Sequence, residues 1–238
     1  MVSQFRARYE CALCPTRGRC VAADLDETAL SRLGDCLTTT APLSRGDHLY
    51  RVGDRADNCF LVRSGVFKTT RVTGYGDEYV TGFSFPGELI GLGGQSEGRH
   101  PDTATALSSS TACRIRLDDL PRLWKIGTGP ALLRLIGEHE QLNSAIQVNL
   151  CQSRAPARIA GFLQLTMSRF SRLGFDPTHL SMPMSRTDLA NHLGLTLECL
   201  SRVLGSWKRA GVIETSRDQI SILKPAEIAT TAHHLTAY

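Results

Sequence analysis

The feature that most constrains the fold is a series of short apolar runs separated by glycines over residues 37–115. Runs such as HLYRVGD and CFLVRSG are rich in β-branched and aromatic residues. Brief strands at nearly regular spacing, with turn signals between them, are typical of a β sandwich or barrel. Glycines stand where such turns are needed, at Gly46, Gly53, Gly65 and Gly87. The sequence therefore predicts a β domain in this region.

A helix with a repeating seam is expected after the breaker GTGP at residues 127–130. Pro130 suits the first turn of a helix, and seam residues recur at alternating spacings of three and four. They are Leu132, Leu135, His139, Leu142, Ile146 and Asn149. Because little of the chain between a β domain and a basic domain can cover this seam, we expect it to pair with a second copy. The alternative is an amphipathic helix packed on its own domain.

Two capped helices and a pair of strands are predicted near the C-terminus. Ser185 and Asp188 form an S-x-x-D capping box, and Thr196 can cap the following helix. Gly194 suits the turn between the helices, and Gly211 ends the second one. The segment VIETSRDQISIL then reads as two short strands around a polar turn. This order of elements predicts a winged helix-turn-helix.

The second of these helices carries polar residues that suit base recognition. Glu198, Ser201 and Arg202 are related as i, i+3 and i+4, so their side chains emerge together near its N-terminus. Arginine can bind a guanine edge and glutamate can accept from cytosine, whereas the alternative is an ordinary solvated Glu–Arg pair. Residues 154–224 contain ten Lys or Arg against five acids, although the whole chain carries only +4. This basic region indicates a polyanionic partner, and we expect it to bind double-stranded DNA and to read its bases.

Three thiols, Cys11, Cys14 and Cys20, lie within ten positions near the N-terminus. The N-terminus lacks the apolar region of a secretory signal, and no stretch of about 18 apolar residues occurs, so we expect a cytoplasmic protein. Clustered cysteines in a reducing compartment are more often metal ligands or redox groups than disulfides. Four cysteines could hold zinc, but two C-x2-4-C pairs are usual for zinc, and the five-residue spacer here is longer.

Motifs along nearly the whole chain resemble the CRP/FNR superfamily of bacterial transcription regulators, and within it the FNR-type oxygen sensors. The C-x2-C-x5-C spacing matches the FNR pattern, and Cys113 matches the position of the distant fourth ligand. The phrases GDEYVTGF, LTLECLSRVLG and RFSRLGF are similar to their FNR counterparts.

The resemblance implies an α+β chain with a β-roll sensor domain, a long dimerisation helix and a C-terminal winged helix-turn-helix. The corresponding boundaries are 1–22 for a cysteine-rich arm, 23–128 for the sensor, 129–153 for the helix and 154–238 for the DNA-binding domain.

By the same resemblance, Cys11, Cys14, Cys20 and Cys113 hold an oxygen-labile [4Fe-4S] cluster that favours a homodimer. The dimer is expected to bind a palindrome of TTGAT-like half-sites, with Glu198, Ser201 and Arg202 at the base-reading positions. RNA polymerase is the expected partner of the loop at residues 76–78.

The remaining cysteines and the arginines near the N-terminus also carry expectations. Buried thiols without a ligand role are expected at Cys36, Cys59, Cys151 and Cys199. Arginines that could offset the charge of a cluster, or serve only solubility, are Arg6, Arg8, Arg17 and Arg19.

Two rival functions find little support in the residues. A cyclic-nucleotide site of this architecture needs a Gly-Glu turn followed by an Arg-Ser or Arg-Thr pair. Gly87 and Glu88 are present, but Arg99 is followed by His100 and Pro101, so no adjacent hydroxyl exists. An enzyme is not expected either, because no P-loop, nucleophile elbow or H-E-x-x-H motif occurs, and the His233–His234 pair stands near the C-terminus.

Overall fold

The computed structural model describes residues 11–232, which form two compact units. The first unit runs to His139 and the second begins at Glu140. This division falls inside one long helix, α3 (Gly129–Leu150), which therefore contributes to both units. Arg6, Arg8, His233 and His234 lie outside the described residues. The four-part division expected from the sequence stays a prediction.

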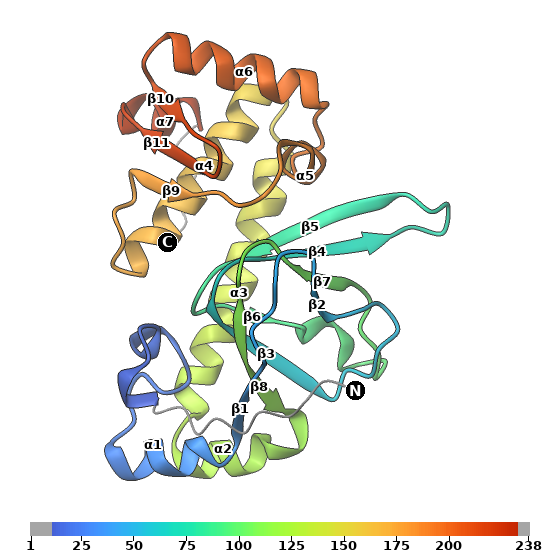
Figure 1. The fold of residues 1–238 in the computed structure, drawn as a ribbon, viewed down its shortest axis with the longest axis vertical. Helices are drawn as coiled ribbons and strands as arrows, with labels where there is room; N and C mark the ends of the chain where they lie inside the picture. The colour runs from blue at the N-terminus through green and yellow to red at the C-terminus, as the bar shows by residue number, and fades with distance from the viewer. Residues whose placement is uncertain (1–10, 233–238) are drawn as a thin grey trace. The chain divides into compact units, whose positions relative to one another are not determined.

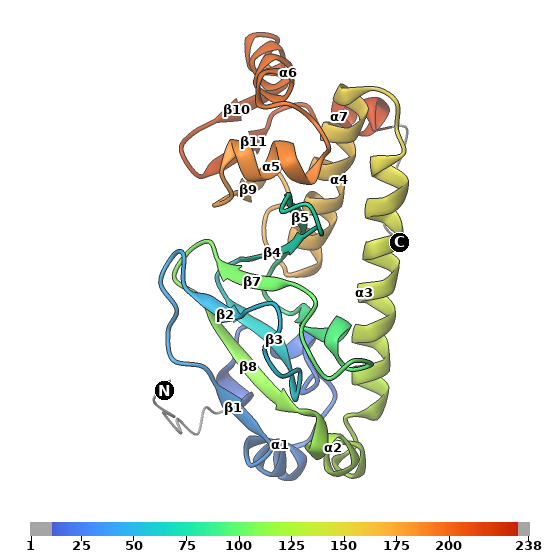
Figure 2. The same cartoon turned by 90° about the vertical axis from the view of Figure 1, so that its right-hand side faces the viewer.

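Two antiparallel four-stranded sheets make up the body of the described first unit (Figures 1 and 2). Their strand orders are β1-β8-β3-β6 and β2-β7-β4-β5. The strands are β1 (Leu37–Thr39), β2 (His48–Tyr50), β3 (Asn58–Ser64), β4 (Phe67–Val72), β5 (Glu78–Ser84), β6 (Leu89–Ile90), β7 (Thr103–Ala106) and β8 (Thr111–Arg116). The predicted β domain is confirmed.

Glycine is required at the tight turn between β3 and β4. Gly65 has a φ of +76°, and a Cβ there would collide with the side chain of Ser110 and the carbonyl of Ser109. Only glycine combines this backbone conformation with such a close approach. The turn predicted at Gly65 therefore has a steric cause outside its own hairpin.

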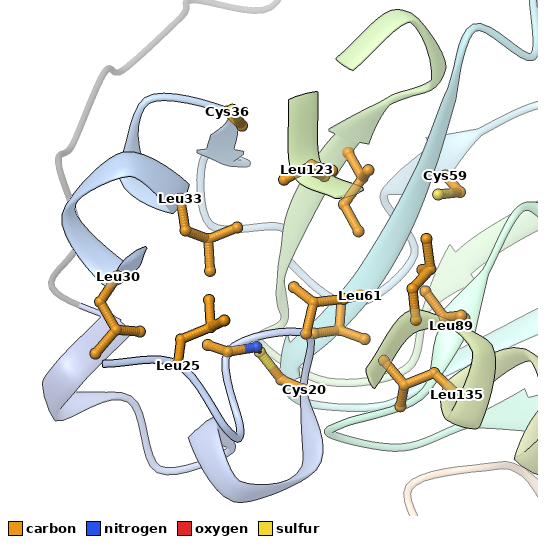
Figure 3. Packing of buried hydrophobic residues seen from close by; sticks show 14 residues of the cluster. Cys20, Leu25, Leu30, Leu33, Cys36, Cys59, Leu61, Leu89, Leu123 and Leu135 are labelled. Atoms are coloured by element: carbon orange, nitrogen blue, oxygen red, sulfur yellow. The ribbon is translucent and has the colours of Figure 1, made fainter. Parts of the chain in front are cut away.

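Strand β3 is buried on both faces, which explains its unbroken apolar run. Phe60 and Val62 pack against Phe67 and other residues of the second sheet, in a core between the two sheets. Cys59 and Leu61 belong to a second core, which residues of the helices share (Figure 3). Because alternate side chains of a strand point to opposite faces, a strand that serves two cores needs apolar residues throughout.

The second core joins the sheet to the helices of the first unit. Short 3-10 turns are η1 (Cys11–Leu13), η2 (Arg17–Arg19), η3 (Leu92–Gly94) and η4 (Leu117–Asp119), and the helices are α1 (Glu27–Gly34), α2 (Leu120–Ile126) and the first part of α3. Asp26 caps α1 by accepting from the Ala29 amide at 2.7 Å. Leu33 and Leu123 bring α1 and α2 into this core with exposed fractions of 0% and 1%.

The second unit contains helices around a small antiparallel sheet (Figure 1). Its elements after α3 are α4 (Ala155–Arg172), β9 (His179–Ser181), α5 (Arg186–His192), α6 (Leu197–Arg209), β10 (Ile213–Thr215), β11 (Gln219–Ile222) and α7 (Pro225–Thr231). The predicted strand pair is β10 and β11, and β9 adds a third strand, in the order β10-β11-β9. No helix within residues 11–232 is long and apolar enough to cross a membrane.

Two leucines of α6 give a matched test of this packing. Leu200 is fully buried, whereas Leu197 in the same helix is 42% exposed. We expect Leu200→Ala to lower the free energy of unfolding by about 2–5 kcal/mol, because the truncation leaves a cavity. Leu197→Ala should change it by only about 0.5 kcal/mol. Urea unfolding followed by circular dichroism measures both, and equal losses would contradict the assigned faces of α6.

Candidate metal centre and nucleic-acid interface

The three N-terminal cysteines follow a backbone with a three-residue period. The Cys14 amide donates to the Cys11 carbonyl at 3.2 Å, and the Arg17 amide donates to the Cys14 carbonyl at 3.0 Å. The Cys20 amide continues the series by donating to the Arg17 carbonyl at 3.2 Å. Side chains three residues apart eclipse one another in such 3-10 turns. The two 3-10 turns are separate and Cys20 itself is extended, so these close turns shorten the segment and keep its three cysteines near one another.

The fourth thiol comes from a strand that is paired on both sides. Cys113 lies in β8 opposite Thr39 of β1 and Leu61 of β3. Both neighbours fix its backbone, in contrast to the short turns that carry the other three cysteines. Cys113, which matches the distant fourth ligand of the resemblance, is thus held on a strand with two neighbours.

All six pairs among these four thiols interact electrostatically. Burial, followed by repulsion from Cys14, raises the pKa of Cys11. Burial raises the pKa of Cys20 to about 12, and the neighbouring thiols add to this effect. Burial likewise raises the pKa of Cys113 to about 11, and Cys14 and Cys11 raise it further. The four side chains therefore converge, and their thiolate forms require positive charge nearby.

Four cysteine thiols are a donor set that zinc and iron-sulfur clusters both use. Zinc holds four sulfurs at about 2.3 Å, which places them about 3.8 Å apart around one point. Among the described residues, no group of three or more His, Cys, Asp or Glu side chains is arranged to hold one ion. A [4Fe-4S] cluster would be held by four cysteine thiolates, so Cys11, Cys14, Cys20 and Cys113 would supply its ligand set.

Two arginines lower the pKa of the thiols, and the sequence argument had found only one of them. Arg17 lowers the pKa of Cys11, as its position between the cysteines suggested. Arg63 lowers the pKa of both Cys11 and Cys113. The pairing of β3 with β8 shifts register between Val62 and Ser64, so Arg63 occupies a β-bulge. Bulges re-aim side chains near functional sites, but the sequence gives no signal for this one.

The second half of the cysteine segment is packed into the core rather than loose. Cys20, Val21 and Ala22 are 6%, 1% and 0% exposed. Figure 3 shows Cys20 among Leu25 and Leu61 of the same core. The Ala22 amide donates to the Cys20 sulfur at 3.3 Å, a contact that stabilises a thiolate. Residues 20–22 of the expected cysteine-rich arm are therefore part of the core, because their side chains are buried.

Arg19 also contacts the long helix. Its Nη2 forms a 3.0 Å ion pair with Oε2 of Glu138 in α3, and the two side chains are 25% and 30% exposed. The pair joins the turn before Cys20 to the long helix within the first unit.

Part of the predicted seam of α3 faces its own domain. Leu132 and Leu135 are 9% and 3% exposed and belong to the core that contains Cys20. The neighbouring residues Leu133 and Ile136 are 59% and 42% exposed instead. The prediction that Leu132 and Leu135 contact a second copy is wrong, because the sheet already covers them.

The rest of the predicted seam gives a mixed result. His139, Leu142 and Ile146 are half-buried, and their pairing role stays a prediction. Asn149 is 2% exposed, and its Nδ2 donates to the Arg158 carbonyl at 2.9 Å. Asn149, which was expected on the pairing seam, is instead used inside the second unit.

The four remaining cysteines divide into two kinds. Cys36 and Cys59 are 4% and 2% exposed, which confirms the expected burial. Cys151 is exposed and Cys199 is half-buried, so the expectation is wrong for both. Cys199 lies in the first turn of α6, where the end of a surface helix leaves it accessible.

The predicted caps of the helix-turn-helix are confirmed. Ser185 Oγ accepts from the Asp188 amide at 2.9 Å, and the Asp188 carboxylate accepts from the Ser185 amide at 3.4 Å. Thr196 Oγ1 accepts from the Cys199 amide at 3.2 Å at the start of α6. Gly194 takes a φ of +60° between α5 and α6. These local interactions fix where each helix begins.

The predicted base-reading residues share the open face of α6. Leu200 and Leu204 are 0% and 4% exposed and hold the helix against its unit. Glu198, Ser201 and Arg202 are all exposed. A hydrogen bond from its own backbone amide, aided by Thr196 and Arg202, lowers the pKa of Glu198. A carboxylate acceptor and a guanidinium donor therefore stand together near the N-terminus of the helix.

The place of a phosphate-binding pair in the sensor domain is filled differently. Arg99 donates from Nη1 to the Gly53 carbonyl at 2.6 Å. His100 is 3% exposed and stacks on Tyr50 with ring centroids 3.8 Å apart. Both side chains are thus engaged within the domain, and the expectation that a cyclic nucleotide does not bind stays a prediction.

Known families match both halves of the chain. Residues 41–126 match a cyclic nucleotide-binding domain, and residues 157–230 match a Crp-like helix-turn-helix domain. The transcriptional activator protein FnrA of Stutzerimonas stutzeri is 34% identical, covering 90% of this chain and 88% of its own length. The fumarate and nitrate reduction regulatory protein of Escherichia coli K12 is 31% identical, covering 94% and 90%.

Solved structures share the fold. FixK2 from Bradyrhizobium japonicum superposes with a TM-score of 0.70 at 22% identity, covering 85% of this chain and 98% of that one. TTHB099 from Thermus thermophilus, described as a CRP-family transcriptional regulator, gives 0.64 at 19% identity, covering 84% and 100%. The relatives above, which exceed 30% identity over most of their length, carry the assignment further than the fold. The chain belongs to the CRP/FNR family of transcription regulators, which are DNA-binding proteins and not enzymes.

Proposed function

We propose that this regulator responds to oxygen through a [4Fe-4S] cluster held by Cys11, Cys14, Cys20 and Cys113. The observation that carries the proposal is the convergence of these four thiols, every pair of which interacts. The names of its relatives, which refer to fumarate and nitrate reduction, support a role in anaerobic gene expression. A cytoplasmic location is part of the proposal. When bound, the cluster supplies an oxygen-sensitive group and the positive charge that the thiolates need.

The residues around the thiols would link that site to the long helix. Cys113 holds one corner on a paired strand, and Cys20 extends the core that contains Leu135 of α3. Arg19 adds an ion pair from the same segment to Glu138 of α3. A change in the cysteine segment would therefore act on the part of α3 that it contacts, which also carries the exposed Leu133 and Ile136. We propose that this exposed face pairs two copies.

DNA and polymerase contacts complete the proposal. Glu198, Ser201 and Arg202 would read TTGAT-like half-sites of a palindrome in the major groove, since they lie on the open face near the start of α6. The turn at residues 76–78, at the tip of the β4–β5 hairpin, would contact RNA polymerase. Tyr75 at this tip is 97% exposed, which leaves its ring available to a partner.

Iron content tests the proposed cofactor. Protein purified without air should contain about four iron and four sulfide per chain. Cys113→Ser should lose most of this iron and its anaerobic DNA binding, while its far-ultraviolet circular dichroism stays unchanged. The exposed Cys151 provides the matched control, so Cys151→Ser should keep the iron. Stoichiometric zinc in colourless wild-type protein, or full iron in Cys113→Ser, would rule out the assigned ligands.

Sedimentation equilibrium tests the pairing face. Ile136→Glu places a charge on the exposed apolar face of α3. In a twofold dimer both protomers bring this charge to the interface. Burying one such side chain contributes about 1.5–3 kcal/mol, so the dissociation constant of the iron-loaded dimer should rise by about tenfold or more. Arg134→Glu, at another exposed position of α3, should have a much smaller effect. Equal dimerisation by Ile136→Glu and wild type would place the interface elsewhere.

Discrimination between DNA sequences tests the reading helix. Arg202→Ala should weaken binding to a TTGAT-like palindrome by about 1–3 kcal/mol and binding to a random duplex much less. Arg209→Ala, at the far end of α6, should leave the ratio of the two affinities unchanged. Fluorescence anisotropy at fixed salt measures both constants. An equal loss on both duplexes would make Arg202 a phosphate contact instead.

A further inference from the structure

Arg158 reaches from α4 to the turn of the helix-turn-helix. It lies in the first turn of α4, and its Nη1 donates to the carbonyls of Leu193 and Gly194 at 2.9 and 3.1 Å. These carbonyls follow the last turn of α5, where a helix leaves carbonyl groups without helical partners. The Nε atom of Arg158 is also buried, so the side chain packs against the protein rather than extending into solvent. One guanidinium thus satisfies two acceptors of the turn.

The rest of the turn is already satisfied by α5 itself. The Gly194 amide donates to the Asn191 carbonyl at 3.1 Å, and the Leu195 amide donates to the Ala190 carbonyl at 2.9 Å. With Gly194 at a positive φ, this arrangement is a Schellman-type end for α5. Arg158 supplies the donors that this motif lacks. Because α6 begins at Leu197, close to the contacted carbonyl of Gly194, the guanidinium helps to fix the direction in which α6 leaves the turn.

The backbone of the same residue is tied to the end of α3. Asn149 Nδ2 donates to the Arg158 carbonyl at 2.9 Å, and Gln152 Nε2 donates to Asn149 Oδ1 at 3.1 Å. The buried Asn149 has no solvent to replace these bonds, so their loss is costly. Arg158 therefore contacts the last turn of α3 through its main chain and the helix-turn-helix through its side chain. All of these residues belong to the second unit.

We propose that Arg158 is a positioning residue for DNA reading: it holds α6 at a fixed angle to α4 and to the end of α3. Its Nη1 is committed to two carbonyls of the turn, so the role assigned to it is support of Glu198, Ser201 and Arg202. The Asn149 contact makes the end of the long helix part of the same support. The inference needs no cluster and goes beyond the proposed oxygen response.

The main rival for a basic residue in this unit is a phosphate contact, and salt dependence separates the two roles. Each neutralised phosphate adds about 0.9 to the slope of log affinity against log salt. A positioning residue changes the affinity at every salt concentration and leaves that slope unchanged. The two roles therefore differ in a measurable quantity that a simple loss of affinity does not report.

Hydrogen exchange and DNA binding of Arg158→Met test the proposal on the full chain. Without DNA, the amides of Gly194 and Leu195 should exchange about tenfold faster or more, because two charge-assisted hydrogen bonds are lost. Affinity for a synthetic TTGAT-like palindrome should fall by about tenfold or more, with an unchanged salt slope. Arg154→Met, an exposed residue at the start of α4, should leave the two exchange rates at wild-type values.

A conservative variant keeps the test valid if Arg158→Met folds poorly. Arg158→Lys retains the charge but not the planar fork, so a smaller increase in exchange at Gly194 and Leu195 is expected. Wild-type exchange in both variants, or a salt slope reduced by about 0.9 in Arg158→Met, would overturn the proposal. The exchange measurement uses no DNA, so it does not depend on the choice of operator. A wrong operator would instead show itself as weak binding by the wild type.

Discussion

The convergence of four thiols, of which Cys20 is buried and the other three are half-buried, is the constraint on which the proposed sensor depends. Burial raises the pKa of Cys20 to about 12 and of Cys113 to about 11, so these two thiols are neutral near pH 7 when no metal is bound. Their thiolates are stable only beside strong positive charge, and Arg17 and Arg63 supply only part of it. In the proposed sensor, metal ions would supply the remainder, and metal binding is commonly coupled to the folding of the segment that carries the ligands.

The three-residue period of the cysteine segment gives a physical reason for its motif. The amide-to-carbonyl bonds from Cys14 to Cys11, Arg17 to Cys14 and Cys20 to Arg17 repeat one turn geometry. These bonds close short turns before and after Cys14 and keep the segment compact, whereas Cys20 follows them with an extended backbone.

Features that depend on neighbouring residues in the chain were predictable from the sequence. The capping box at Ser185, the cap at Thr196 and the glycine turn at Gly194 are local, and each is found as expected. Features that depend on distant contacts were not predictable. Arg63 reaches the thiols through a bulge that only the pairing of β3 with β8 reveals.

The seam of α3 failed for a related reason. Leu132 and Leu135 have the same spacing as Leu133 and Ile136, so periodicity alone cannot tell which pair meets the sheet. The seam rested on spacings of three and four, and both pairs satisfy a spacing of three. Only the position of Leu61 and Leu89 on the sheet decides that Leu135 is buried in its own core (Figure 3).

The magnitudes of the contacts decide what holds the cysteine segment to α3. The Arg19–Glu138 pair is about a quarter exposed on each side, and pairs near the surface contribute about 0.2–1 kcal/mol. Truncating a buried leucine such as Leu135 costs about 2–5 kcal/mol. The packing of Cys20 and Leu135 in one core therefore supplies most of the attachment. The ion pair instead restricts how the segment lies along the helix, because Arg19 belongs to the cysteine segment and Glu138 to α3. Attachment and alignment are thus carried by different contacts, the first by the shared core and the second by the ion pair.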